Sequence, residues 1–280
     1  MIRIYKSKLG NYYEIEGKYY QSQAGNWDIW INTPDLYQAL LQESNSAESI
    51  DETSIKDFKI NLLAPIESQE VWASGVTYLR SRDARMEESE NAKTAYDRVY
   101  EADRPELFFK STASRVAGPG DDVNIRKDST WNVPEPELTL FINNRAEIAG
   151  YTVGNDMSSR SIEGENTLYL PQAKTYERSA ALGPCILLTA SPIHPDTTID
   201  LKIYRENSCV YHGQTQLNTM KRKLQDLVDY LHRGLKFEQG CFLMTGTGIV
   251  PPSTFTLESE DEVHIEIESI GTLKNVVKWF

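Results

Sequence analysis

The segment from Trp131 to Lys174 contains two strand-like runs whose adjoining ends carry acidic side chains. It opens with WNVPEPELTLFINN, and in an extended strand successive side chains alternate between the two faces. Glu135 and Glu137 therefore point the same way. The apolar side chains that pack behind them are Leu138, Leu140 and Ile142. A fold that contains this strand must place two carboxylates in one small volume.

The same segment predicts a third carboxylate beside the first two. Residues 143–145 form a turn and residues 148–153 a returning strand, which brings Asp156 back to Glu135 and Glu137. Three carboxylates this close repel one another unless a positive charge lies among them. Oxygen ligands without Cys or His suit a hard divalent cation such as Mg²⁺ or Mn²⁺. Lys174 would add an ammonium group at the rim of such a site.

A Glu-x-Glu pair on a strand also has a simpler interpretation, the solvated face of a half-buried sheet. Two features favour a binding site. Pro134 and Pro136 confine pairing of this strand to a sheet edge or a strand start, where a ligand can approach. The GND segment, residues 154–156, and residues 164–169 are expected to be irregular backbone, as loops that carry binding sites usually are. Spacing alone leaves both interpretations open.

Composition limits the partners of the chain. Its 280 residues are 40% hydrophobic, enough for a sizeable core. A formal net charge of -12 disfavours nucleic acid and anionic membrane surfaces, because both bind clustered Lys and Arg. A small anionic substrate stays compatible with this charge, since a few local cations and a metal ion can reverse the potential inside one pocket.

The sequence predicts a cytoplasmic protein. Its first residues, MIRIYKSKLG, lack the apolar core of a signal peptide, and no apolar run approaches the length of a membrane span. Cys185, Cys209 and Cys241 lack metal-ligand spacing and a disulfide framework, so each is expected to be a small buried residue. The histidines are dispersed along the chain, which disfavours a zinc site.

Residues 1–60 are predicted to form a small N-terminal domain and residues 61–280 the main one. Residues 2–31, including WDIWI, alternate polar and apolar side chains, as in an antiparallel meander. Thr33 and Pro34 predict the start of a short helix. Residues 43–57 are acidic and Ser-rich, which predicts a solvated loop near the domain boundary.

In the main domain the patterns predict many short strands and few helices. Strands are expected within residues 55–66, 70–79, 105–110, 179–193, 197–205 and 208–216, and a helix capped by Thr219 over residues 220–233. Residues 79–100 are densely charged, which predicts a loosely held helix or a lid. The simpler interpretation of its arginines, Arg80, Arg82 and Arg85, is an exposed basic face rather than a set of substrate contacts. The whole pattern predicts an α+β, β-rich fold, a roll or sandwich with insertions.

Lys110 and Thr247 are candidate ligand contacts. Lys110 follows the apolar residues 107–109, so it is either a buried neighbour of the strand or a contact for a ligand. In MTGTG the glycines let backbone amides approach a ligand, and the hydroxyl of Thr247 can donate to a carboxylate. A turn that ends a strand explains the same pattern.

Several ordered motifs within residues 60–280 resemble the fumarylacetoacetate hydrolase family. They are VWASGVTYLRSRDAR, RPELFFK, WNVPEPELTLFIN, GYTVGNDMSSRSIEGENTLYLPQAK, LGPCI, MTGTG and ESIGTLKNVV. The resemblance implies the mixed β-sandwich roll of that family. It also implies that Glu135, Glu137 and Asp156 hold a divalent cation and that Lys174 approaches the bound substrate.

One departure from the family pattern narrows the expected reaction. Hydrolytic members carry an Asn-Tyr pair followed by a His that, with a Glu, activates water; here Thr77 and Tyr78 form the pair, and Ser81 stands in place of the His. The missing base favours the branch of the family that dehydrates 2-keto-3-deoxy sugar acids. The implied activity is that of a lyase, which converts a 2-keto-3-deoxy-pentonate to 2,5-dioxopentanoate and water through a metal-stabilised enolate.

The resemblance also implies residue roles, and it leaves alternatives open. Lys174 is expected to shuttle the proton, and the expected substrate contacts are Ser74, Lys110, Gln172 and Thr247. An acylpyruvate hydrolase, an oxaloacetate decarboxylase or a hydroxymuconate-type isomerase of the family would begin from the same chelated 2-oxo acid. A non-catalytic β-rich module that binds a sugar acid or Ca²⁺ would use the same carboxylates. Because the family forms dimers and tetramers, a homodimer or homotetramer is expected.

Overall fold

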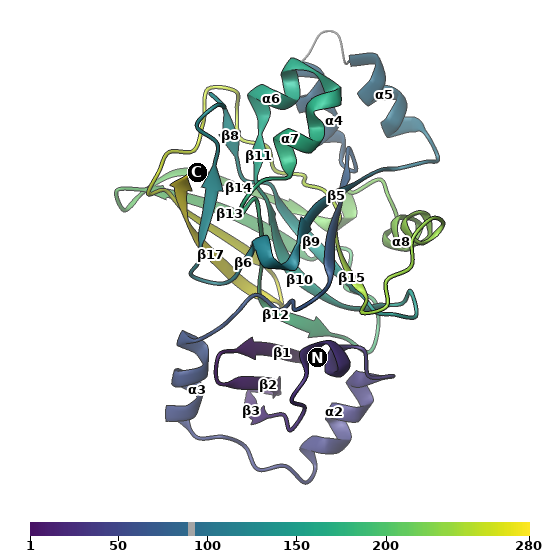
Figure 1. Ribbon diagram of the computed structural model, residues 1–280, viewed down its shortest axis with the longest axis vertical. Helices are drawn as coiled ribbons and strands as arrows, with labels where there is room; N and C mark the ends of the chain where they lie inside the picture. The colour runs from purple at the N-terminus through teal and green to yellow at the C-terminus, as the bar shows by residue number, and fades with distance from the viewer. Residues whose placement is uncertain (89–92) are drawn as a thin grey trace.

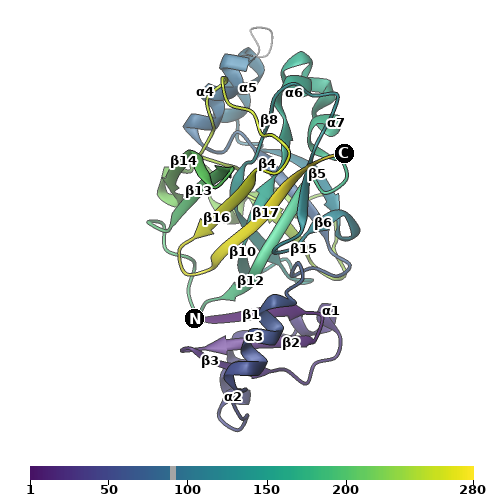
Figure 2. The same ribbon diagram turned by 90° about the vertical axis from the view of Figure 1, so that its left-hand side faces the viewer.

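The computed structural model describes residues 1–88 and 93–280, without the side chains of residues 84–88 and 93–95. A ten-stranded and a five-stranded β-sheet form the body of the protein. Figures 1 and 2 show the N-terminal residues, in purple, at one end of this body and a group of helices at the other. These helices are α4 (Leu79–Glu88), α5 (Lys93–Glu101), α6 (Arg160–Glu165) and α7 (Leu170–Lys174).

The ten-stranded sheet has the order β3-β2-β1-β12-β10-β9-β15-β4-β5, and β6 pairs with β12 outside this path. Its strands are β1 (Ile2–Ser7), β2 (Gly10–Ile15), β3 (Lys18–Gln21), β4 (Glu70–Gly75), β5 (Glu106–Thr112), β6 (Val116–Ala117), β9 (Pro136–Ile142), β10 (Ile148–Asp156), β12 (Ala180–Leu188) and β15 (Cys241–Met244). The predicted hairpin is confirmed as β9 and β10, which pair antiparallel near the middle of the sheet. Pro136 begins β9, where a missing backbone N–H is tolerated.

The five-stranded sheet packs against one face of the large sheet. Its order is β14-β13-β16-β17-β7. Its strands are β7 (Asp122–Ile125), β13 (Thr198–Arg205), β14 (Ser208–Gln216), β16 (Glu262–Ile267) and β17 (Gly271–Trp279), and β8 (Asn132–Val133) pairs separately with β11 (Ser158–Ser159). Leu138 and Leu140 of β9 share a buried apolar core with Leu201 of β13 and Ile265 of β16. The mixed β-sandwich predicted from the sequence is confirmed.

The opposite face of the large sheet carries a second core, which the N-terminal segment covers. Helices α1 (Trp27–Ile31) and α2 (Leu36–Ser44) bring Trp30 and Leu40 against Phe141 of β9 and Phe242 of β15. Leu140 enters the first core and its neighbour Phe141 the second, as the alternation of side chains along a strand requires. Both faces of β9 are therefore buried.

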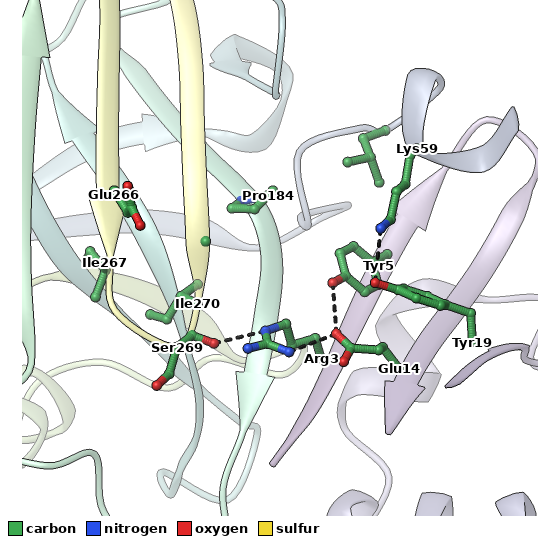
Figure 3. A pocket seen from close by; sticks show the side chains of 12 residues that line it. Arg3, Tyr5, Glu14, Tyr19, Lys59, Pro184, Glu266, Ile267, Ser269 and Ile270 are labelled. Carbon is green, nitrogen blue, oxygen red and sulfur yellow. Dashed lines mark hydrogen bonds and ion pairs between the residues drawn. The ribbon is translucent and has the colours of Figure 1, made fainter. Parts of the chain in front are cut away.

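The N-terminal segment continues the large sheet through β1, which pairs antiparallel with β12. Beside this pairing lies a pocket of about 450 Å³ between the N-terminal strands and the β16–β17 turn (Figure 3). Arg3 crosses it, donating from Nε to the carbonyl of Ser269 at 2.8 Å and from a terminal nitrogen to Glu14 at 2.8 Å. The division of the chain near residue 60 stays a prediction.

The remaining helical elements are short. They are α3 (Glu52–Ile60), α8 (Leu224–His232) and the 3-10 turns η1 (Ala113–Arg115), η2 (Thr167–Tyr169) and η3 (Leu217–Thr219). Helix α8 buries Leu227, Val228 and Leu231 in the core between the sheets. Within the described ranges, none of the helices combines the length and apolar character needed to cross a membrane.

Two strand predictions near the N-terminus are wrong because local caps favour helices. WDIWI forms α1, whose first turn is capped by Asn26: the amide of Ile29 donates to its side chain at 2.9 Å. Residues 52–60 form α3 rather than a loop and a strand. Asp51 caps this helix by accepting from the amide of Ser54 at 2.7 Å. The strand predictions followed the alternating apolar pattern and did not take these two polar caps into account.

Two predicted helix starts and one predicted burial are also wrong. Helix α2 begins at Leu36, after Asp35, rather than at Pro34. Helix α8 begins at Leu224, because residues 217–219 form a 3-10 turn and the amide of Lys221 donates to the carbonyl of Thr77 at 2.9 Å. Cys209 is exposed, since β14 is the edge strand of its sheet.

Candidate active site

The three predicted carboxylates meet at one end of the β9–β10 pair. Glu137 is the second residue of β9, Asp156 the last of β10, and Glu135 immediately precedes β9. The pairing of Gly154 with Glu137 and a 3.0 Å hydrogen bond from the Asp156 amide to the Glu135 carbonyl hold them together. One carboxylate oxygen from each lies within 4.8 Å of the other two, and all three residues are buried. The prediction that these three carboxylates lie close together is confirmed, and their burial is a finding of the structure.

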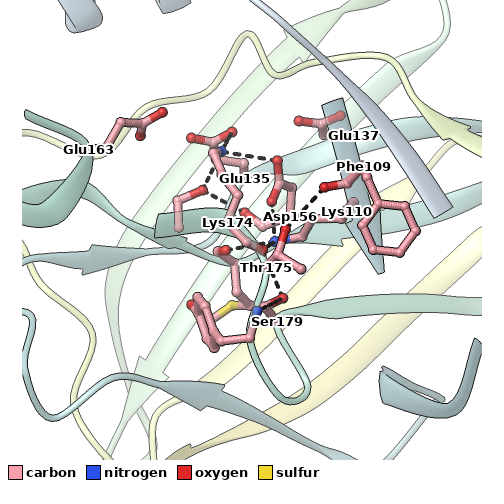
Figure 4. A network of polar contacts seen from close by, with 12 residues as sticks. Phe109, Lys110, Glu135, Glu137, Asp156, Glu163, Lys174, Thr175 and Ser179 are labelled. Carbon is pink, nitrogen blue, oxygen red and sulfur yellow. Dashed lines mark hydrogen bonds and ion pairs between the residues drawn. The ribbon is translucent and has the colours of Figure 1, made fainter. Parts of the chain in front are cut away.

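Lys174, the last residue of α7, directs its ammonium group into this cluster (Figure 4). Its Nζ donates to Glu135 Oε2 at 2.8 Å, to Asp156 Oδ2 at 3.0 Å and to Ser158 Oγ at 2.5 Å. The side chain of Lys174 is 1% exposed. A buried ammonium that contacts two of the three carboxylates balances part of their charge, and it can exchange protons with a ligand bound beside them.

Two further buried cations contact the same carboxylates. Lys110 on β5 places Nζ 2.6 Å from Asp156 Oδ1, and Arg160 on α6 donates to Glu135 Oε1 at 2.7 Å. Arg160 also lies 3.9 Å from the buried carboxylate of Glu163. The sequence prediction missed Arg160 and Glu163. Their nearness to Asp156 in NDMSSRSIEG was a signal, but nothing in the sequence shows that α6 turns back toward Glu135.

Glu137 is bound by a backbone amide. The amide of Gly246 donates to Glu137 Oε2 at 2.6 Å. Burial raises the pKa of Glu137 well above its usual value, and repulsion from Asp156 and Glu135 raises it further. Gly246 has φ of 92°, and a Cβ there would lie 2.0 Å from Thr77 Oγ1, so glycine is required at this position.

The donor set fits a hard divalent metal ion. All three side chains offer carboxylate oxygens, the ligand type that such ions prefer. The crowding that raises the pKa of Glu137 is relieved when two positive charges enter among the three carboxylates. Glu135, Glu137 and Asp156 can therefore hold a metal ion.

The cluster borders a small cavity. The cavity is lined by Ser74, Gly75, Val76, Ser81, Phe108, Glu135, Asp156, Arg160, Lys174, Gly246 and Thr247. Its free volume is about 10 Å³, no more than one water molecule occupies. Val76 has φ of 55°, a conformation that a β-branched residue rarely adopts. Backbone strain thus lies where β4 leads into α4.

Two of the four predicted substrate contacts line this cavity. Ser74 and Thr247 are both buried, and their hydroxyls donate to backbone carbonyls at 3.0 and 3.1 Å. Lys110 is fully buried and lies outside the set of lining residues. Gln172 is exposed on α7 and is also outside that set. Substrate contact by each of these residues stays a prediction.

The arginines of α4 were expected to form an exposed basic face. Arg82 donates to Asp83 Oδ1 at 2.8 Å, lies 3.5 Å from Asp97 of α5 and stacks 5.1 Å from the ring of Tyr100. It therefore ties the two helices together. Arg80 lines a separate cavity of about 320 Å³, and the side chain of Arg85 lies outside the described residues.

Comparison with known proteins gives relatives along most of the chain. A "Probable 2-keto-3-deoxyxylonate dehydratase" of Haloferax volcanii is 47% identical over 214 residues, which are 76% of this chain and 73% of that protein. A "2-dehydro-3-deoxy-D-arabinonate dehydratase" of Saccharolobus solfataricus is 40% identical over 260 residues, 87% of each chain.

The fold is also similar to that of a solved structure. A "2-keto-3-deoxy-D-arabinonate dehydratase complexed with magnesium and 2,5-dioxopentanoate" superposes with a TM-score of 0.80 at 33% sequence identity, covering 100% of this chain and 99% of that one. Residues 70–278 match the family model described as fumarylacetoacetate (FAA) hydrolase C-terminal. The match includes the carboxylate cluster, Lys174 and the cavity around them, and the chain belongs to the fumarylacetoacetate hydrolase family.

Proposed function

We propose that this protein is a metal-dependent hydro-lyase that converts a 2-keto-3-deoxy-pentonate to 2,5-dioxopentanoate and water. The observation that carries the proposal is the contact of the Lys174 ammonium with two of three buried, mutually repelling carboxylates. The relatives named as dehydratases of 2-keto-3-deoxy sugar acids, at 40% and 47% identity, supply the substrate class. The dehydratase solved with 2,5-dioxopentanoate supplies the product.

Glu135, Glu137 and Asp156 would hold the cation, which we propose is Mg²⁺ or Mn²⁺ because the dehydratase of similar fold binds magnesium. Such an ion, when bound, acts as a Lewis acid toward a 2-oxo acid and makes the proton on C3 easier to remove. The net reaction removes one water molecule without a redox change overall. No nicotinamide or flavin is needed for it.

Lys174 is the proposed proton carrier. Its Nζ contacts Glu135 and Asp156, so a 2-oxo acid bound at the carboxylate cluster would lie beside it. As the neutral amine it would take the proton from C3, and as the resulting ammonium it would give a proton to the hydroxyl that leaves C4 as water. Transfer of a proton from C5 to C3 would then give an enol, and loss of its O–H proton with protonation at C4 would give the aldehyde. Ser74 and Thr247, which line the cavity, would orient the substrate.

The test is product analysis with purified protein, Mg²⁺ or Mn²⁺, and a panel of 2-keto-3-deoxy sugar acids. Formation of 2,5-dioxopentanoate, identified by NMR, is the expected result. Release of carbon dioxide from oxaloacetate or of a second acid from an acylpyruvate, without dehydration of any sugar acid, would favour another 2-oxo acid enzyme. Unchanged sugar acids that still bind the metal-loaded protein would favour a binding module.

We also propose that the protein is a cytoplasmic homodimer or homotetramer. Trp279 and Phe280 at the end of the chain are 47% and 62% exposed, and such apolar side chains are typical of subunit contacts. Cys185, Cys209 and Cys241 are free thiols, which fits a reducing compartment. Light scattering after size exclusion would measure the subunit number. A monomer at micromolar concentration would contradict the proposed assembly.

A further inference from the structure

Lys110 is a fully buried lysine whose ammonium group makes three polar contacts within the protein, two hydrogen bonds and one ion pair. Its Nζ lies 2.6 Å from Asp156 Oδ1, donates to the carbonyl of Met157 at 3.0 Å, and makes a short hydrogen bond to the carbonyl of Lys174. An ammonium group has three N–H donors and no acceptor. Two backbone carbonyls and the carboxylate of Asp156 therefore hold this ammonium group within the protein.

The three contacts belong to two segments that must be held in register for the proposed reaction. Asp156 is the last residue of strand β10 and Met157 follows it, whereas Lys174 ends helix α7. The carbonyl of Lys174 also accepts from Ser179 Oγ at 2.9 Å. Lys110 thus joins the backbone that carries one carboxylate of the cluster to the backbone that carries the proposed proton carrier (Figure 4).

We infer that Lys110 is a positioning residue, which orients the carboxylate of Asp156 and fixes the end of α7 so that Lys174 points into the carboxylate cluster. It acts from behind the cluster, since it is 0% exposed and does not line the cavity. This differs from the substrate contact expected for Lys110 from the sequence. The effect on turnover rests on the proposed function, whereas the effect on the protein backbone does not.

Charge and burial explain why a lysine stands here. An ion pair between fully buried groups forms only when further hydrogen bonds satisfy the remaining protons, and the carbonyls of Met157 and Lys174 do so for Lys110. Residues outside the first ligand set of a metal site orient the ligands, and their loss lowers activity or metal affinity by about 10- to 100-fold. A change at Lys110 should have an effect of this size.

The experiment compares Lys110→Met with Arg205→Met as the matched control. Arg205 is also paired with a buried carboxylate, that of Asp261, but neither residue lines the cavity. Three quantities are measured for both variants: amide hydrogen exchange in the metal-free protein, Mn²⁺ affinity by electron paramagnetic resonance, and kcat and KM separately.

For Lys110→Met we expect faster exchange in residues 170–175 without metal, because the end of α7 loses its tie to β10. We expect kcat to fall by about 10- to 100-fold with little change in KM. Arg205→Met should lower thermal stability and leave all three quantities at their wild-type values. Wild-type exchange in residues 170–175 of Lys110→Met would overturn the inference. So would a higher KM at unchanged kcat, which would identify Lys110 as a substrate contact.

If Lys110→Met does not fold, Lys110→Gln replaces it, because an amide keeps two N–H donors without the charge. Its exchange in residues 170–175 and its kcat should change in the same direction by smaller factors, and wild-type values for both would overturn the inference. A wild-type protein without dehydratase activity would contradict the proposed function. The hydrogen-exchange measurement would still test Lys110 in that case.

Discussion

Two buried acidic sites in this protein are neutralised in different ways. At Asp261 one carboxylate meets one guanidinium: Oδ1 accepts from Arg205 Nε and Oδ2 from a terminal nitrogen of Arg205, each at 2.8 Å. The amide of Glu258 completes the set by donating to Oδ2 at 2.9 Å. Such a bidentate pair with a satisfied carboxylate is a structural arrangement.

The carboxylate cluster at the end of β9 and β10 is crowded instead. Glu135 and Asp156 share the ammonium of Lys174, and burial next to them raises the pKa of Glu137 well above its usual value. Bringing three acids together out of water destabilises a fold unless a cation joins them. A buried charged group is therefore not enough to identify a functional site. A buried carboxylate whose repulsion by its neighbours is not balanced, as at Glu137, is the stronger indication.

Replacing Glu137 with Gln should have the largest effect on activity. The change keeps the shape of the side chain and an acceptor for the Gly246 amide, but it removes a proposed metal ligand. We expect turnover to fall to the background rate, beyond the roughly 100-fold typical of residues that only orient a ligand. Metal-dependent turnover is measured with saturating substrate. A variant with the wild-type rate and wild-type metal dependence would show that Glu137 is not a ligand.

Lys174→Met should affect chemistry more than metal binding. Loss of a positioned acid–base group typically lowers the rate by about 10² to 10⁴-fold. Glu135, Glu137 and Asp156 are unchanged in this variant, so we expect it to bind Mn²⁺ still. Single-turnover kinetics and metal titration measure the two properties separately. An unchanged rate with metal bound would remove Lys174 from the mechanism.

Metal should stabilise the folded protein through the cluster and not through Asp261. At a metal concentration 100 times the Kd, a ligand that binds only the native state raises the unfolding free energy by about 2.7 kcal/mol. We expect this gain in the wild type and in Asp261→Asn, and a much smaller one in Glu137→Gln. Urea unfolding with Mg²⁺ and after chelation measures it. Equal gains in all three proteins would place the metal elsewhere.

The carboxylate cluster could be predicted from the sequence, whereas the contacts that Arg160 and Lys110 make with it could not. Alternation along residues 136–142 and the return through Asp156 were enough to predict the hairpin and its three carboxylates, because both depend on neighbours in the chain. Arg160 was missed because its contact with Glu135 depends on how α6 packs over the hairpin. The role of Lys110 was likewise invisible, since its acceptors are backbone carbonyls on two other segments.

Asp261→Asn should change stability and leave chemistry alone. The variant loses the charge that holds the bidentate Arg205 contact, and hydrogen bonds to charged groups contribute about 1.5–3 kcal/mol each, less where one partner is partly exposed. Since the side chain of Arg205 is 30% exposed, we expect the unfolding free energy to fall by about 2 kcal/mol. Chemical denaturation measures this, and kcat of the folded variant should equal the wild-type value. A large loss of kcat would mean that this pair supports the active site.

The smallest effect is expected at the outer partner of the same arginine. Glu258 also contacts Arg205, but its side chain is 58% exposed. Exposed ion pairs contribute little, because water screens the attraction and both side chains lose freedom, so Glu258→Gln should change the unfolding free energy by less than about 0.5 kcal/mol. The same denaturation series measures it beside Asp261→Asn. Equal destabilisation of the two variants would mean that an exposed ion pair contributes as much to stability as a buried, fully hydrogen-bonded one. The contrast drawn between Asp261 and the carboxylate cluster depends on burial, so that result would remove its physical basis.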